Sequence, residues 1–338
     1  MSLKEIKQIL LALGVVMCSA QAANAQKELK FATLLPPTHI YTESLFAPVA
    51  KALNEAAGNE LKVQIYPPPF ATMGNSWERV NQGIVDISAQ LLSAAPVPMP
   101  KADVVALPNL TQSSEAASVA MWRLYEQGLL DQALSRNVIV LGFFVPSANL
   151  LFTKSPVTSL DDFKGLRLRV ASPVSARIIE ALGGSPISLP STEIYQALDR
   201  GVAEGLLFHS EALHSFHLDK LVDNQLQGQT FGMAPLAILM NRKSYESLND
   251  KARAAVDSVK GEDLSRRLGK IFDGIESEHQ RKFAEVEGNA VNTINPADLG
   301  NFNARMQQVI DQWVAQTDGG ADVLAAFKRE VDTAGKSN

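Results

Sequence analysis

The chain has little of what commonly carries catalytic or cofactor chemistry. Its 338 residues include a single cysteine, Cys18, which excludes an intramolecular disulfide, and cleavage after Ala25 would remove this cysteine and with it any thiolate metal site. No phosphate-binding loop, dinucleotide-binding glycine motif or nucleophile elbow occurs, so neither nucleotide binding nor serine hydrolysis has support. The spacings of five and three between His209, His214 and His217 match no recurring zinc signature. We therefore expect no metal, no cofactor and no catalytic residues.

Positive charge and long apolar runs are scarce as well. The formal net charge of −5 argues against nucleic acid and anionic membrane surfaces as partners. The apolar run at residues 9–17 is well short of the ~20 residues that span a bilayer, and no later run is long enough. We therefore expect no nucleic-acid partner and no membrane-spanning segment.

The N-terminus does have the features of a secretory signal. Two lysines precede the short apolar run, and an A-x-A cleavage site ends at Ala25. Residues 1–25 are therefore predicted to be a cleavable signal peptide, and the mature chain to be exported. A cut after Ala22, an uncleaved anchor and a lipid on Cys18 are the alternatives. The lipid is disfavoured because the residue before the cysteine is methionine, which is not small.

The mature chain repeats one order of elements. Residues 29–89 and residues 166–208 each read as strand, helix, strand, helix, strand, with Ser76 and Ser191 placed as helix caps. This alternation is typical of α/β folds, and the length suits two domains. We predict two lobes of similar build. Lobe I takes residues 26–147 and about 236–275, and lobe II takes residues 148–235 and about 276–338.

Residues 250–285 differ from the rest of the chain. They combine dense charge with apolar residues at helical spacing, the pattern of a helix that packs one stripe and solvates the other. The buried-looking strand at 138–145 and the strand at 236–240 are predicted to cross between the lobes.

Arg169 is the candidate that the strand pattern itself points to. It stands near the carboxyl end of the strand at 166–171, before the helix that Ser172 and Pro173 begin. Ligands of open α/β sheets bind at this edge. A guanidinium offers a planar fork of donors that matches a carboxylate and stays charged. The competing interpretation is that Arg167 and Arg169 both face solvent.

Three motifs resemble one known family. The run DFKGLRLRV at residues 162–170 is similar to "DLKGLKIRV", PSTEIYQAL at 190–198 to "PxxEVYxAL", and GVAEG at 201–205 to "GVVDG". Together they resemble the DctP-type solute-binding proteins of tripartite ATP-independent periplasmic (TRAP) transporters, over nearly the whole mature chain. The resemblance implies a type II periplasmic binding protein, a two-lobed Venus-flytrap fold of α/β class. A long C-terminal helix braces its lobes, and the segment at 250–285 is the candidate.

The resemblance also implies a function. The protein would be a periplasmic monomer that captures an organic acid and delivers it to the small and large TRAP membrane subunits, without catalysis. The family arginine at the position of Arg169 binds the ligand carboxylate. Residues 146–152 lack the second arginine that many members carry, and Phe208 stands where asparagine is common. These departures predict a monocarboxylate with an apolar or aromatic body.

Several alternatives stay open at this point. Phe208 could point into the core, and the ligand could be a C4-dicarboxylate. The protein could sense carboxylates for a receptor, serve another transporter class, or be an exported enzyme. Other candidate ligand contacts follow predicted strands or lie near the hinge, and each could instead cap a helix or fill the core: His39, Tyr41, Asn75, Trp77, Gln90, Ser93, Asn149 and Phe231.

Overall fold

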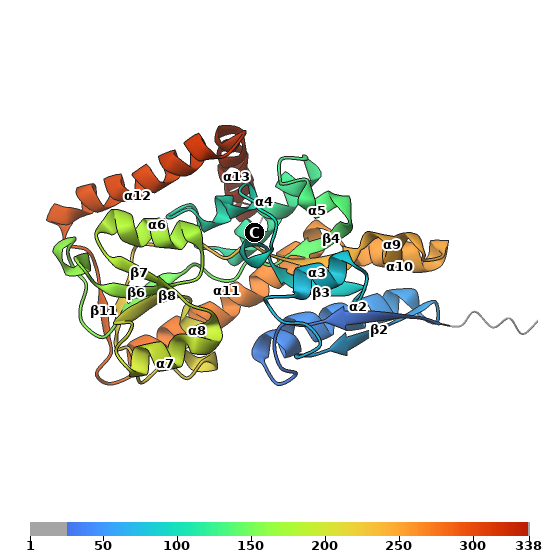
Figure 1. Cartoon of the computed structure of the whole chain (residues 1–338), viewed down its shortest axis with the longest axis horizontal. Helices are drawn as coiled ribbons and strands as arrows, with labels where there is room; N and C mark the ends of the chain where they lie inside the picture. The colour runs from blue at the N-terminus through green and yellow to red at the C-terminus, as the bar shows by residue number, and fades with distance from the viewer. Residues whose placement is uncertain (1–25, 337–338) are drawn as a thin grey trace, which may run out of the picture.

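Two separate sheets carry the strands of the protein in the computed structural model, which describes residues 26–336 (Figure 1). The predicted signal peptide lies outside the described residues. The strand order is β2-β1-β3-β10-β4 in the first sheet and β11-β9-β5-β8-β6-β7 in the second. Helices pack against each sheet, so the predicted two-lobed α/β fold is confirmed. We call the halves built on the first and second sheets lobe I and lobe II.

Lobe I contains a mainly parallel sheet, completed by β10, a strand that comes much later in the chain than the other four. The first two strands pair in parallel, and β10 is antiparallel to both of its neighbours, β3 and β4. Buried and exposed residues alternate at the start of β2, whereas every residue of β4 is buried, the pattern of a strand covered on both faces. The strands and helices are β1 (Lys27–Ala32), α2 (Ala47–Ala57), β2 (Leu61–Tyr66), α3 (Ser76–Asn81), β3 (Ile87–Leu91), α4 (Ser114–Glu126), α5 (Ala133–Arg136), β4 (Val138–Phe143), β10 (Leu236–Asn241), α9 (Arg242–Glu246) and α10 (Asp250–Val259).

Lobe II has the same kind of sheet with shorter strands. β6 pairs in parallel with β7 and β8, whereas β5 runs antiparallel to β8 and β9. Its elements are β5 (Leu150–Thr153), β6 (Arg167–Val170), α6 (Pro173–Leu182), β7 (Ser185–Ser188), α7 (Ile194–Asp199), β8 (Gly205–Phe208), α8 (Ser210–Ser215), β9 (Asn224–Leu226) and β11 (Ala290–Asn292).

The chain passes between the lobes in loops and along one helix. The loops are residues 144–149, between β4 and β5, and residues 227–235, between β9 and β10. The prediction that the strands themselves cross was wrong, because β4 and β10 pair with each other inside the first sheet. The two loops are hydrogen-bonded to each other: the Asn149 N–H donates to Gly232 O at 2.8 Å, and the Phe231 N–H donates to Asn149 O at 2.9 Å.

The long helix α11 (Glu262–Glu285) braces both lobes, as the resemblance implied (Figure 1). The segment at 250–285 is two helices, because Gly261 adopts a positive φ of 129° between α10 and α11. One turn apart on α11, two carboxylates hold the N-termini of other helices. Asp273 accepts the Ser114 N–H at 2.6 Å at the start of α4, and Glu276 accepts the Ser210 N–H at 2.9 Å at the start of α8. Negative charge at a helix N-terminus is stabilising.

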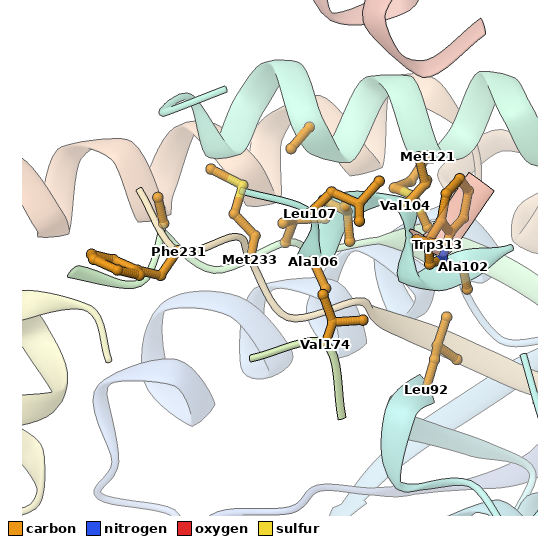
Figure 2. Close-up of a cluster of buried hydrophobic side chains, with 14 of the residues drawn as sticks. Leu92, Ala102, Val104, Ala106, Leu107, Met121, Val174, Phe231, Met233 and Trp313 are labelled. Atoms are coloured by element: carbon orange, nitrogen blue, oxygen red, sulfur yellow. The ribbon is translucent and has the colours of Figure 1, made fainter. Parts of the chain in front are cut away.

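Two C-terminal helices close the fold. α12 (Pro296–Gln316) packs on α6, and α13 (Gly320–Gly335) packs on α4. Figure 2 shows part of the largest core, in which Met121 of α4, Val174 of α6, Phe231 and Met233 of the second loop and Trp313 of α12 are buried. Residues from both lobes therefore share this core. Within the described part of the chain, every helix is too short or too polar to cross a membrane.

Candidate ligand-binding cleft

A cavity of about 390 Å³ lies between the lobes, at the carboxyl ends of strands from both sheets. We call it the cleft. Arg169 of β6 and Phe208 of β8 line it from lobe II, and the segment after β1 lines it from lobe I. Its walls are mainly apolar, with a few polar side chains among them. Such a cavity at the switch between two α/β lobes is a common site for a small ligand.

Arg169 is a buried cation with no anionic partner among residues 26–336. Its backbone is held because β6 pairs on both sides with β7 and β8, and only 3% of the residue is exposed. Nε donates to the Leu189 carbonyl at 3.0 Å, whereas Nη1 is buried with no hydrogen-bond partner in the described structure. Burial lowers the pKa of Arg169 to about 10, so the guanidinium remains charged at neutral pH. An unpaired buried charge strongly favours an anionic ligand.

The N-terminus of α6 adds positive potential beside this arginine. Ser172 caps the helix by accepting the Ser175 N–H at 3.1 Å, Pro173 occupies the first turn, and Gly183 ends the helix in the left-handed conformation, all as predicted. Both serines line the cleft. The unpaired N–H groups of a helix N-terminus favour an anion.

Phe208 forms an aromatic wall against Arg169. Its ring centroid lies 5.0 Å from Arg169 Cζ, which is a cation–π contact, and 5.6 Å from the ring of Phe216. Phe208 is half-buried and lines the cleft. A ring that stacks on the guanidinium covers its face and leaves the edge donors for a carboxylate.

Tyr41 joins the two lobes at one side of the cleft. Its hydroxyl donates to Glu211 Oε2 and lies 3.3 Å from His209 Nε2, both in lobe II. Burial of the hydroxyl and the charge of Glu211 raise the pKa of Tyr41, so the group stays a donor. Ser215 also donates to Glu211. Burial lowers the pKa of His209, which keeps its ring neutral at neutral pH.

The remaining predicted contacts divide into two groups. His39, Ser93 and Asn149 line the cleft together with Arg169, Phe208 and Tyr41. Asn75, Trp77, Gln90 and Phe231 do not line it.

The second group serves the structure around the cleft. The Asn75 carboxamide accepts the Thr72 N–H at 2.9 Å, and Trp77 and Phe231 lie in the core. Gln90 is fully buried and accepts a hydrogen bond of 2.7 Å from the Ser76 hydroxyl. Ser76 therefore does not cap its helix as predicted; Ser191 does not cap either, because no side-chain cap bond forms at either start.

His209 and Phe216 also line the cleft, although neither is among the ligand contacts predicted from the sequence. A signal for His209 was available, because it directly follows the β8 strand that Phe208 ends. Phe216 had no such signal, since it follows a short helix. Among residues 26–336, no group of three or more histidine, cysteine or acidic residues is placed to hold a metal ion.

Comparisons with known proteins agree with this geometry. The model of DctP, the bacterial extracellular solute-binding protein family 7, matches residues 31–317. The C4-dicarboxylate-binding periplasmic protein DctP of Rhodobacter capsulatus is 27% identical over 231 residues, which are 67% of this chain and 64% of that protein.

Two solved structures have the same fold. A TRAP periplasmic solute-binding protein from Bordetella bronchiseptica with bound (R)- and (S)-mandelate has a TM-score of 0.82 at 25% identity, over 90% of this chain and 99% of its own. A marine metagenome TRAP solute-binding protein specific for aromatic acids, in complex with metahydroxyphenylacetate, has a TM-score of 0.84 at 24% identity. The match covers 91% of this chain and 99% of that protein.

Proposed function

Because the chain belongs to the DctP family, family 7 of the bacterial extracellular solute-binding proteins, we propose that its ligand is a monocarboxylate with an apolar or aromatic body. Membership itself makes the chain a periplasmic TRAP solute-binding protein for organic acids, and not an enzyme. The observation that carries the ligand proposal is Arg169, a buried cation that has no anionic partner in the described part of the chain and lies over the ring of Phe208 in a mainly apolar cleft.

The balance of charge in the cleft favours one carboxylate over two. Of the cationic side chains among the described residues, Arg169 alone lines the cleft, and the neutral histidines His39 and His209 are the other basic groups there. A second carboxylate would be desolvated without a cationic partner, which is costly. The Bordetella relative with bound mandelate, an aromatic monocarboxylate, supports the proposal. A C4-dicarboxylate is the competing ligand class, because the Rhodobacter relative is a C4-dicarboxylate-binding protein.

The proposed mechanism is hinge closure. The open lobes admit the acid, Arg169 of lobe II binds its carboxylate, and closure excludes water from the ion pair, which strengthens it. The ligand shifts the population towards the closed form by binding it more tightly. The monomeric closed form then docks on the small and large TRAP membrane subunits.

A thermal-shift screen tests the ligand class. The protein is unfolded and refolded to remove co-purified ligand, and then tested with benzoate, phenylacetate, mandelate, short keto acids, succinate and malate. A ligand at 100 times its dissociation constant adds about 2.7 kcal/mol of stability, which raises Tm by several degrees. We expect the largest shifts from the aromatic monocarboxylates. Succinate binding as tightly as benzoate would contradict the proposal and favour the dicarboxylate.

The bond between Tyr41 and Glu211 gives a test of closure. It joins the lobes and so forms only when they are together. Hydrogen bonds to charged groups contribute about 1.5–3 kcal/mol, so Tyr41→Phe is expected to weaken binding about tenfold or more, measured by calorimetry with the best ligand of the screen. Tyr245→Phe is the matched control, because the Tyr245 hydroxyl bonds Asp257 within lobe I. Equal affinities of the two variants would contradict a role of this contact in closure.

A further inference from the structure

His39 presents a hydrogen-bond donor for which the described residues supply no acceptor. It lines the cleft from lobe I, in the segment after β1. Its Nε2 atom is buried and has no hydrogen-bond partner in the described structure. A buried polar group left unsatisfied costs about 1–3 kcal/mol, and buried polar groups without partners are rare. Because His39 lines the cleft, a ligand bound there could supply the missing partner.

The other ring nitrogen of His39 fixes where its proton is. The backbone N–H of Tyr41 donates to His39 Nδ1 at 3.1 Å, so Nδ1 acts as an acceptor and carries no proton. In the neutral ring the proton is then on Nε2. Burial lowers the pKa of His39, opposed by the charge of Glu211 and reinforced by His209, so the neutral form prevails at neutral pH. Glu211 is already bonded to Tyr41 and Ser215.

An aromatic wall connects this donor to the arginine. The ring of His39 lies 6.4 Å from that of Phe216, which lies 5.6 Å from Phe208, whose ring is 5.0 Å from Arg169 Cζ. A flat ligand whose carboxylate binds Arg169 would stack along this wall. The end of the ligand opposite its carboxylate would then reach His39.

We propose that His39 determines specificity by donating its Nε2–H to an oxygen at the far end of the ligand. The preferred ligands are then aromatic monocarboxylates with a hydroxyl, ether or keto oxygen on the ring, away from the carboxylate. This inference rests on the proposed function and deepens it. It also gives each lobe one polar anchor, Arg169 in lobe II and His39 in lobe I, so such a ligand ties the lobes together.

The experiment compares benzoate with 2-, 3- and 4-hydroxybenzoate by calorimetry on the ligand-free mature protein. We expect 3- or 4-hydroxybenzoate to bind about tenfold more tightly than benzoate, since a site built to bond a hydroxyl discriminates against the analogue that lacks it. The hydroxyl of 2-hydroxybenzoate stays beside the carboxylate and should give no gain.

Three variants isolate the donor. His39→Phe keeps a ring but removes Nε2–H, so within this variant the ratio of the affinities for the hydroxylated acid and for benzoate should fall to about one. His39→Gln places an amide N–H near the position of Nε2 and should restore part of the preference. His214→Phe is the matched control, because the His214 side chain is 73% exposed.

Each outcome bears on the inference. A preference that is present in the wild type, lost in His39→Phe and partly restored in His39→Gln supports it. Equal binding of benzoate and all its hydroxy derivatives, or a preference that survives in His39→Phe, overturns it and leaves the proposed function intact. Failure of every aromatic acid to bind the wild type overturns the proposed function, and the role of His39 with it.

Discussion

Arg169→Met is expected to abolish ligand binding without destabilising the ligand-free protein. Truncating one partner of a buried charge pair commonly costs 2–5 kcal/mol or more, which is a loss of affinity of at least about 30-fold. The ligand-free protein should respond differently, because Arg169 is 3% exposed and has no anionic partner among the described residues. Methionine fills a similar volume without the charge, and such exchanges at buried ionic sites are often neutral or stabilising by about 1–4 kcal/mol.

Two measurements on one variant check this prediction. Calorimetry should show no binding of an acid that binds the wild type, while thermal unfolding without ligand gives an equal or higher Tm. Arg167→Met is the matched control on the same strand. Its exposed side chain donates to the carbonyls of Gly201 and Val202, away from the cleft, so binding should persist. Retained binding in Arg169→Met would contradict the role of Arg169 as the carboxylate anchor. A large decrease in the Tm of the ligand-free variant would identify Arg169 as a structural residue.

The second large effect is expected where α11 packs closely against the start of α4. A Cβ atom built on Gly269 of α11 would lie 2.5 Å from the Cα of Glu115 and 2.5 Å from the carbonyl oxygen of Ser114, both backbone atoms at the start of α4. Gly269→Ala must therefore push the helices apart. The displacement would also weaken the contacts of Asp273 with the same helix start. We expect a loss of at least about 2 kcal/mol of unfolding free energy.

A glycine-to-alanine exchange five residues further along α11 should instead increase the free energy of unfolding. Gly274 is exposed, and a Cβ built there meets nothing within 4 Å. Alanine is favoured over glycine inside a helix by about 0.5–1 kcal/mol, so Gly274→Ala should stabilise the protein. Urea or thermal unfolding of the two variants gives the comparison. A similar change in the free energy of unfolding for both variants would show that the close contact between α4 and α11 does not limit the size of the residue at position 269.

Local patterns in the sequence predicted the elements that position Arg169, the proposed anchor. The alternation around Arg169, the Ser172 cap and the Gly183 stop placed this arginine at the carboxyl end of a strand, and the structure has all three. These features were predictable because each depends on residues within one or two turns of the chain. The order of elements likewise predicted two lobes, since alternation of strands and helices is set locally.

Contacts between segments far apart in the chain could not be predicted from the sequence. Tyr41 and Glu211 are 170 positions apart, and no periodicity indicates that their side chains meet. The sequence also did not indicate which side chains at the end of a strand point into the cleft. Gln90 is hydrogen-bonded to Ser76 inside lobe I, whereas Ser93 lines the cleft. Pattern reasoning assigns a residue to an element, but the partner depends on how elements pack, which is a property of the whole fold.

The place of β10 in lobe I has a consequence for the order in which the protein can fold. This strand lies between β3 and β4, yet the chain reaches it only after β5 to β9 of lobe II have been made. Until residue 241 is available, β3 and β4 each have an unpaired edge, and such edges invite pairing with other chains. The sheet of lobe I is therefore begun first but closes only after five strands of lobe II have been made, so its early strands stay open to pairing with other chains until most of the chain has emerged.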